Sequence, residues 1–133
     1  MKPSAEMIEL ARRMMAGAYA PYSNFAVGAA LRGESGSLYG GCNVENAAYP
    51  QGLCAEAAAI GALVAGGERK ITEVLVRAKA GDVVTPCGGC RQRLREFAGD
   101  GTLIHLCSPD GLIQTVTLGM LLPMSFGPSH LGK

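Results

Sequence analysis

The sequence contains no tryptophan and little charge of either sign. Lysine plus arginine number 12 against 11 for aspartate plus glutamate, and charged residues make up 17% of the chain. A surface that binds nucleic acid needs clustered lysine and arginine, and the basic residues here are scattered. This balance argues against a nucleic-acid partner and favours a neutral or lightly charged small molecule.

Long apolar runs are also missing. No stretch approaches the roughly 20 apolar residues that a membrane helix needs, and residues 1–6 lack the apolar segment and cleavage site of a secretory leader. We therefore expect no membrane association and a cytoplasmic location. The five cysteines include one Cys-x-x-Cys pair, a pattern that favours metal binding or free thiols over a disulfide framework in an unsecreted chain.

The apolar pattern predicts one globular domain over residues 1–133, of which 48% are hydrophobic. Helical spacing or composition predicts helices over 4–18, 54–65 and 87–97, with a short helical piece at 118–122. Strands are expected over 25–31, 37–44, 71–78, 102–107 and 112–117. Alternation of strands and helices is typical of an α/β domain. We expect a three-layer α-β-α sandwich with a central five-stranded mixed sheet.

Two short motifs carry the chemistry. The first is Leu53-Cys54-Ala55-Glu56, and the second is Pro86-Cys87-Gly88-Gly89-Cys90. A catalytic zinc ion keeps three protein ligands and leaves the fourth tetrahedral position for water. Zinc deaminases carry a closely related signature, in which a glutamate that is not a ligand moves protons. The motifs therefore predict a catalytic zinc site.

The spacing of these residues supports that prediction. Cys54 and Cys87 fall at the starts of two predicted helices, where the helix dipole stabilises thiolates. Cys87 and Cys90 lie at i and i+3, on one face of a helix, so both can bind one ion. Glu56 lies two residues from the first ligand and is free to pass a proton from water to a ring nitrogen and then to a leaving amine. The predicted reaction is hydrolytic deamination.

Other interpretations remain open at this point. Cys42 or Cys107 could complete a closed four-cysteine zinc site, and Cys87 with Cys90 could form a redox dithiol. Closed sites usually carry two Cys-x-x-Cys pairs, and this chain has one. The polar cluster at 43–46 follows a predicted strand, so it could face a cleft or simply form a turn. We expect a structural role for His105, within its strand, and solvent exposure for His130.

Several further motifs resemble the small, homotetrameric, zinc-dependent cytidine deaminases of the cytidine/deoxycytidylate deaminase family. The resemblance covers nearly the whole chain and several motifs in the right order. These motifs are Tyr19-Ala20-Pro21-Tyr22-Ser23, Phe25 to Ala30, Gly41 to Ala47, the two cysteine motifs, and Leu121 to Pro128.

The resemblance implies a role for each matching residue. Cys54, Cys87 and Cys90 would hold Zn²⁺, and Glu56 would be the proton shuttle. Asn43 and Glu45 would bind the ribose hydroxyls. The remaining substrate contacts would come from Phe25 against the nucleoside, from the backbone near Ala55 and Pro86 at the polar edge of the pyrimidine, and from Ala47, Tyr49 and Phe126 of neighbouring subunits. The implied assembly is a homotetramer with shared active sites.

The implied reaction is hydrolysis of cytidine and 2′-deoxycytidine to the uracil nucleosides and ammonia, for pyrimidine salvage. The alternatives are a deaminase of a modified cytosine nucleoside and a non-catalytic, zinc-stabilised binding module; an editor of nucleic acids is disfavoured by the charge balance. One position departs from the pattern, because Ala57 stands where many three-cysteine members carry arginine. We expect helix N-termini and backbone N–H bonds to sulfur to offset the missing charge.

Overall fold

The structure, a computed structural model, describes residues 2–79 and 81–133. Its centre is one five-stranded sheet with strand order β2-β1-β3-β4-β5. The strands span Val27–Gly33 (β1), Leu38–Cys42 (β2), Ile71–Ala78 (β3), Leu103–Ser108 (β4) and Gly111–Thr117 (β5). Only β3 and β4 are paired in parallel, and the other pairs are antiparallel. The predicted mixed sheet is confirmed.

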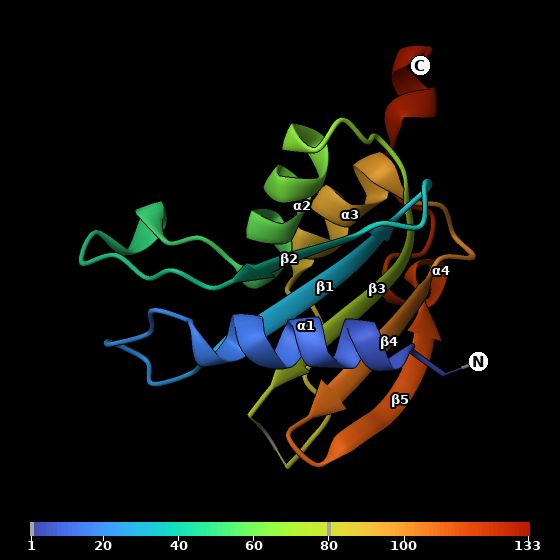
Figure 1. Ribbon diagram of the computed structural model, residues 1–133. Coiled ribbons are helices and arrows are strands. Elements are labelled where there is room, and N and C mark those ends of the chain that lie inside the picture. Colours follow the sequence, from blue (N-terminus) through green and yellow to red (C-terminus); the bar gives the residue numbers. More distant parts are fainter. Residues whose placement is uncertain (1, 80) are drawn as a thin grey trace.

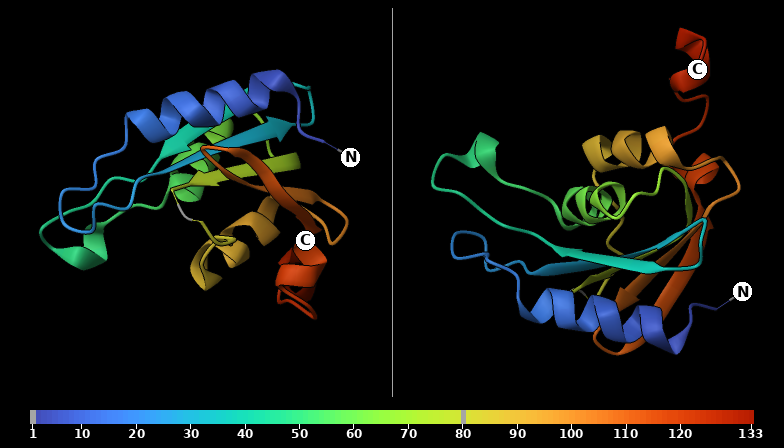
Figure 2. Two further views of the ribbon diagram at one scale, coloured as in Figure 1. Left: turned by 90° about the horizontal axis from the view of Figure 1, so that it is seen from below. Right: turned by 45° about the horizontal axis from the view of Figure 1, so that its top comes forward.

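Helices cover both faces of this sheet (Figures 1 and 2). Helix α1 (Ala5–Ala16) packs on one face, and helices α2 (Ala55–Ala65) and α3 (Gly88–Phe97) pack on the other. A short helix α4 (Leu118–Leu121) and two 3₁₀ turns, η1 (Tyr49–Gln51) and η2 (Pro128–Leu131), complete the elements. The three-layer prediction is therefore correct. Within the described residues, no helix combines the length and apolarity needed to cross a membrane.

Local signals set the helix ends. Ser4 caps α1, because its Oγ accepts a hydrogen bond from the Met7 N–H at 3.2 Å. The same helix ends at Ala16 instead of the predicted residue 18. Gly17 is its C-cap, and the Ala18 N–H bonds to the Met15 carbonyl three residues back, so the four-residue spacing of an α-helix is not continued. Helices α2 and α3 begin directly after cysteines, which occupy their N-cap positions.

Glycine allows α2 to lie close to the sheet. A Cβ atom at Gly41 on β2 would stand 2.3 Å from the Ala59 nitrogen and 2.7 Å from the Ala55 oxygen. Such distances are impossible without moving the helix backbone, so only glycine permits this approach. The close contact places the first turn of α2 against the end of β2, where the polar segment 43–46 begins.

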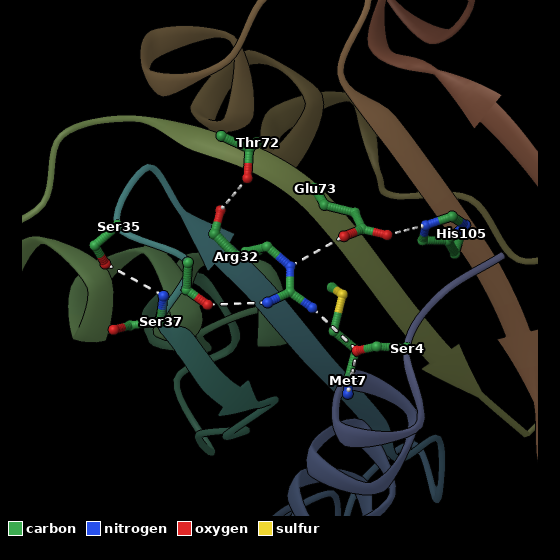
Figure 3. Close-up of polar contacts among 9 residues, drawn as sticks. Ser4, Met7, Arg32, Ser35, Ser37, Thr72, Glu73 and His105 are labelled. Carbon is green, nitrogen blue, oxygen red and sulfur yellow. Dashed lines mark hydrogen bonds and ion pairs between the residues drawn. The ribbon is translucent and has the colours of Figure 1, made fainter. Parts of the chain in front are cut away.

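A polar network occupies the α1 side of the sheet (Figure 3). Glu73 accepts a hydrogen bond from Arg32 at 3.2 Å and lies 2.6 Å from Nε2 of the fully buried His105. The other ring nitrogen of His105 lies 2.8 Å from the Thr115 hydroxyl. Arg32 also donates to the capping Ser4 hydroxyl at 3.0 Å. His105 thus joins β4 to β3 and β5, as expected for a structural histidine. His130 is exposed, as also expected.

Candidate active site

Three cysteines meet where α2 and α3 begin. Cys54 is the N-cap of α2, Cys87 is the N-cap of α3, and Cys90 lies in the first turn of α3. Their sulfur atoms all lie within 4.8 Å of one another. Both helices therefore direct their N-terminal, positive ends at one cluster of thiols, as the sequence predicted.

The thiols have the electrostatics of a metal-ligand set. Burial raises the pKa of Cys54 and of Cys90, while a hydrogen bond from the Cys90 backbone lowers the pKa of Cys87. Ionising Cys54 and Cys90 therefore costs free energy unless a cation lies beside the two thiolates. Three converging soft sulfur donors suit Zn²⁺. The residues present fit the metal that the motifs imply.

The other cysteines discussed above lie elsewhere. Cys107 belongs to the apolar cluster beneath α1, on the opposite face of the sheet. The Cys42 thiol lies 3.8 Å from the Gly17 carbonyl oxygen and is not in the sulfur group. Within residues 2–79 and 81–133, the group contains three cysteines, which argues against a closed four-cysteine site. A redox dithiol would leave Cys54 unexplained.

Glu56 lies next to the cysteines, in the first turn of α2. Its side chain is buried, with 5% of the residue exposed. Burial raises the pKa of Glu56, opposed by a backbone N–H bond and by the charge of Arg93. Among the described residues, no lysine or arginine lies within ion-pair distance of the carboxylate. A carboxyl group whose pKa is raised by burial holds a proton more readily than an exposed one, which suits a group that both takes and gives a proton.

A cleft of about 230 Å³ opens onto these groups. Four of the predicted site residues line it together with Cys54 and Cys87, namely Phe25, Asn43, Ala55 and Glu56. Phe25 is 39% exposed, so its ring offers an apolar surface to a planar ligand. Ala55 is the first residue of α2, where a backbone N–H has no acceptor within the helix.

Asn43 also shapes the cleft. Its Oδ1 accepts from the Val27 N–H at 2.8 Å, and its Nδ2 donates to the Phe25 carbonyl at 2.8 Å. These two bonds hold the start of β1 beside the cleft. An amide has two N–H donors and two lone pairs, so one donor and one lone pair of Asn43 remain for a ligand.

The next predicted residue, Glu45, lines a second hollow of about 340 Å³ with Tyr22 and Tyr49. Its carboxylate accepts from the Tyr22 N–H at 2.9 Å, the Ser23 N–H at 3.1 Å and the Ser23 hydroxyl. These bonds lower the pKa of Glu45. A carboxylate offers about four lone-pair positions, so one position is left for another donor.

The remaining predicted contacts are not in either hollow. Ala47 is exposed in the loop before η1, and Phe126 is 57% exposed near the C-terminus. Its carbonyl accepts from the Gln92 amide at 2.9 Å, and its ring stacks on His130. Pro86 is buried, and its carbonyl accepts from Arg91 at 2.7 Å.

Sequence reasoning missed two arginines at the site. Arg91 bonds to the Pro86 carbonyl, the Leu121 carbonyl and the Thr85 hydroxyl, so it holds the loop before α3 against α4. Arg93 places its NH1 nitrogen 3.7 Å from the Cys90 sulfur. The i, i+3 spacing of Arg93 and Cys90 on a helix was the available signal for this contact.

Residues 1–106 match the family described as "Cytidine and deoxycytidylate deaminase zinc-binding region". A cytidine deaminase of Sporosarcina psychrophila is 42% identical over 114 residues, covering 86% of this chain and 84% of the relative. A cytidine deaminase of Mycobacterium tuberculosis (strain ATCC 25618 / H37Rv) is 44% identical over 123 residues, covering 92% and 89%. The crystal structure of cytidine deaminase from Burkholderia pseudomallei superposes with a TM-score of 0.87 at 37% identity, covering 93% of this chain and 99% of that one.

Proposed function

This chain belongs to the cytidine and deoxycytidylate deaminase family, and from that premise we propose that it hydrolyses cytidine and 2′-deoxycytidine to uridine and 2′-deoxyuridine. Ammonia is the second product, and pyrimidine salvage is the process served. The observation that carries the proposal is the meeting of three cysteine sulfurs beside the buried Glu56, in one cleft. A single domain over residues 1–133, in the cytoplasm, would perform the reaction.

Cys54, Cys87 and Cys90 would hold the zinc ion through their thiolates. When bound, zinc supplies Lewis acidity that makes water a nucleophile at neutral pH. The carboxylate of Glu56 accepts a proton from the attacking water and donates it to a ring nitrogen of the pyrimidine. It then takes the remaining proton from the added hydroxyl and gives it to the amino group, so that the C–N bond breaks, ammonia leaves and a carbonyl remains on the ring. Burial of Glu56 suits this proton transfer, because it raises the pKa of the carboxyl group and so increases its affinity for the proton that it takes from water.

The substrate is positioned by groups on both sides of the cleft. Phe25 packs against the nucleoside. The backbone near Ala55 and Pro86 meets the polar edge of the pyrimidine, since Ala55 and the neighbours of Pro86, Thr85 and Cys87, line the cleft. Asn43 and Glu45 bind the ribose hydroxyls with the donor and acceptor positions that their internal bonds leave open. The low pKa of Glu45 keeps it an ionised acceptor throughout the neutral range.

Replacing Glu45 by Gln should lower kcat/KM for cytidine by about 10- to 100-fold, the effect expected when a hydrogen bond to a charged group is lost. Most of the loss should appear in KM, because the ribose lies away from the reacting carbon. Steady-state kinetics with cytidine measures both constants. Glu34→Gln is the matched control, since Glu34 is exposed and pairs with Lys70 on the hairpin surface. An unchanged KM in a folded Glu45→Gln variant would remove Glu45 from the ribose site.

The proposed assembly is a homotetramer in which Ala47, Tyr49 and Phe126 complete the pockets of neighbouring subunits. Within one chain Tyr49 is 75% exposed, Phe126 57% and Met124 fully exposed, although all are apolar. Large apolar side chains left in solvent are typical of surfaces that bind other chains. Sedimentation should give about four times the 13.7 kDa chain mass. A stable, active monomer would contradict shared active sites.

The direct test of the function is an assay with purified, zinc-loaded protein. Cytidine absorbance should fall as ammonia is released in equal amount, with uridine as the other product. 2′-Deoxycytidine should behave likewise. If the zinc-loaded protein releases ammonia only from a modified cytosine nucleoside, that nucleoside is the substrate and the proposal of cytidine is wrong. If it releases ammonia from no nucleoside, the protein is a binding module.

A further inference from the structure

The sulfur cluster creates a surplus of negative charge. Three thiolates around a divalent cation leave one negative charge uncompensated, and an ionised Glu56 adds another beside it. The surroundings are partly desolvated, because Cys90 and Glu56 are buried. Helix N-termini and the backbone N–H bond to the Cys87 sulfur supply partial charges only. A full positive charge near the sulfurs would strengthen the site.

Arg93 is placed to supply that charge. It lies one helical turn after Cys90 on α3, and its NH1 nitrogen is 3.7 Å from the Cys90 sulfur. The distance fits an N–H donor to a sulfur acceptor, and the bond strengthens when the sulfur is a thiolate. Among the described residues, no carboxylate forms a salt bridge with Arg93 and so competes for its guanidinium.

Arg93 reaches the cluster from outside the substrate cleft. It lines a separate shallow hollow of about 490 Å³ between α2 and α3, together with Ala57, Ile60 and Gln92. The residues that line the substrate cleft do not include Arg93. Ala57 follows Glu56 on α2 and contributes only a methyl group to the hollow. The small side chain leaves room for the guanidinium that arrives from the neighbouring helix.

We propose that Arg93 is the cation that stabilises the Cys90 thiolate of the zinc-loaded site. The positive charge thus comes from α3, because α2 has an uncharged alanine at position 57. Arg93 is a positioning residue, because it acts on a metal ligand and does not touch the substrate. The inference rests on the proposed zinc site, but its readout is retention of the metal and not turnover.

The test is the rate at which zinc passes from the folded protein to an excess of a chromophoric chelator. Arg93→Met keeps most of the apolar stem and removes the charge, and it should release zinc about 10- to 100-fold faster, the range for losing a partner of a metal ligand. Arg93→Lys keeps a charge and should lie between this variant and the wild type. Arg12→Met removes an exposed arginine on α1 and should match the wild type.

A double variant distinguishes charge from packing. Ala57→Arg combined with Arg93→Met should restore slow zinc release, since an arginine at position 57 enters the same hollow. Equal release rates for Arg93→Met and Arg12→Met would overturn the proposal, and so would a double variant no slower than Arg93→Met. If Arg93→Lys releases zinc as fast as Arg93→Met, lost packing explains the effect and the charge role is wrong. A wild-type chain that never binds zinc would instead overturn the proposed function.

Discussion

Glu56→Gln should abolish deamination of cytidine and leave zinc bound. Glutamine has nearly the same shape as glutamate but cannot accept a proton, and removing a general acid–base group typically costs about 10²–10⁴-fold. The loss should fall on kcat, because the role that we propose for Glu56 is the transfer of protons during the reaction. Zinc should stay bound, because the group of possible metal ligands consists of three cysteine sulfurs and Glu56 does not belong to it. Steady-state kinetics and elemental analysis of the same sample measure both quantities.

The control for this prediction is Glu6→Gln, an equal change of charge at an exposed position in the first turn of α1. It should keep wild-type turnover. If Glu56→Gln retains activity within tenfold of the wild type, Glu56 is not the proton shuttle. If activity and zinc disappear together, the side chain supports the metal site and its catalytic role is unproven.

Removing zinc should abolish activity and lower the melting temperature. The three sulfurs come from two separate helices, so a metal that joins them ties α2 to α3 and stabilises the folded chain by its binding free energy. Adding Zn²⁺ back should restore both properties. Mg²⁺ or Ca²⁺ should restore neither, because these ions prefer oxygen ligands. Activity and thermal melting of the chelated and reloaded protein provide the measurement.

Cysteine variants give the same test without a chelator. Cys87→Ser should reduce zinc content and activity together, whereas Cys42→Ser should keep both, because the Cys42 thiol lies outside the cluster. Full activity in the metal-free protein would refute the zinc mechanism. Equal losses in the two variants would point to general damage from cysteine replacement.

Most of the fold could be predicted from the sequence because local signals and the global arrangement agree. Alternating strands and helices, glycine stops and the cysteine N-caps all appear in the linear pattern, and the structure has the predicted sheet and layers. The errors are at the edges. The first helix ends at Ala16, two residues early, and Ile8 on its apolar side is 37% exposed. The turns η1 and η2 were not predicted, since short 3₁₀ turns carry no hydrophobic period.

The candidate site was predictable only in part. The positions of the cysteines within each helix could be predicted, because the i, i+3 spacing of Cys87 and Cys90 and the helix starts are local features. Packing of α2 beside α3 then brings the three sulfurs together. Three arginines, Arg91, Arg93 and Arg95, alternate along α3. Their separate partners depend on tertiary contacts that no local pattern specifies: Arg91 bonds to Leu121, Arg93 to Cys90 and Arg95 to Ser125. The division of Asn43 and Glu45 between two hollows is likewise set by loop packing.

X-ray absorption at the zinc edge of the purified, active protein is the most direct test of the proposed site. It counts the sulfur atoms around the metal and so asks whether a coordination position is open. We predict one zinc per chain with three sulfurs at about 2.3 Å and one lighter ligand atom, the pattern of a catalytic site. Four sulfurs around the ion, or active protein without zinc, would contradict the account.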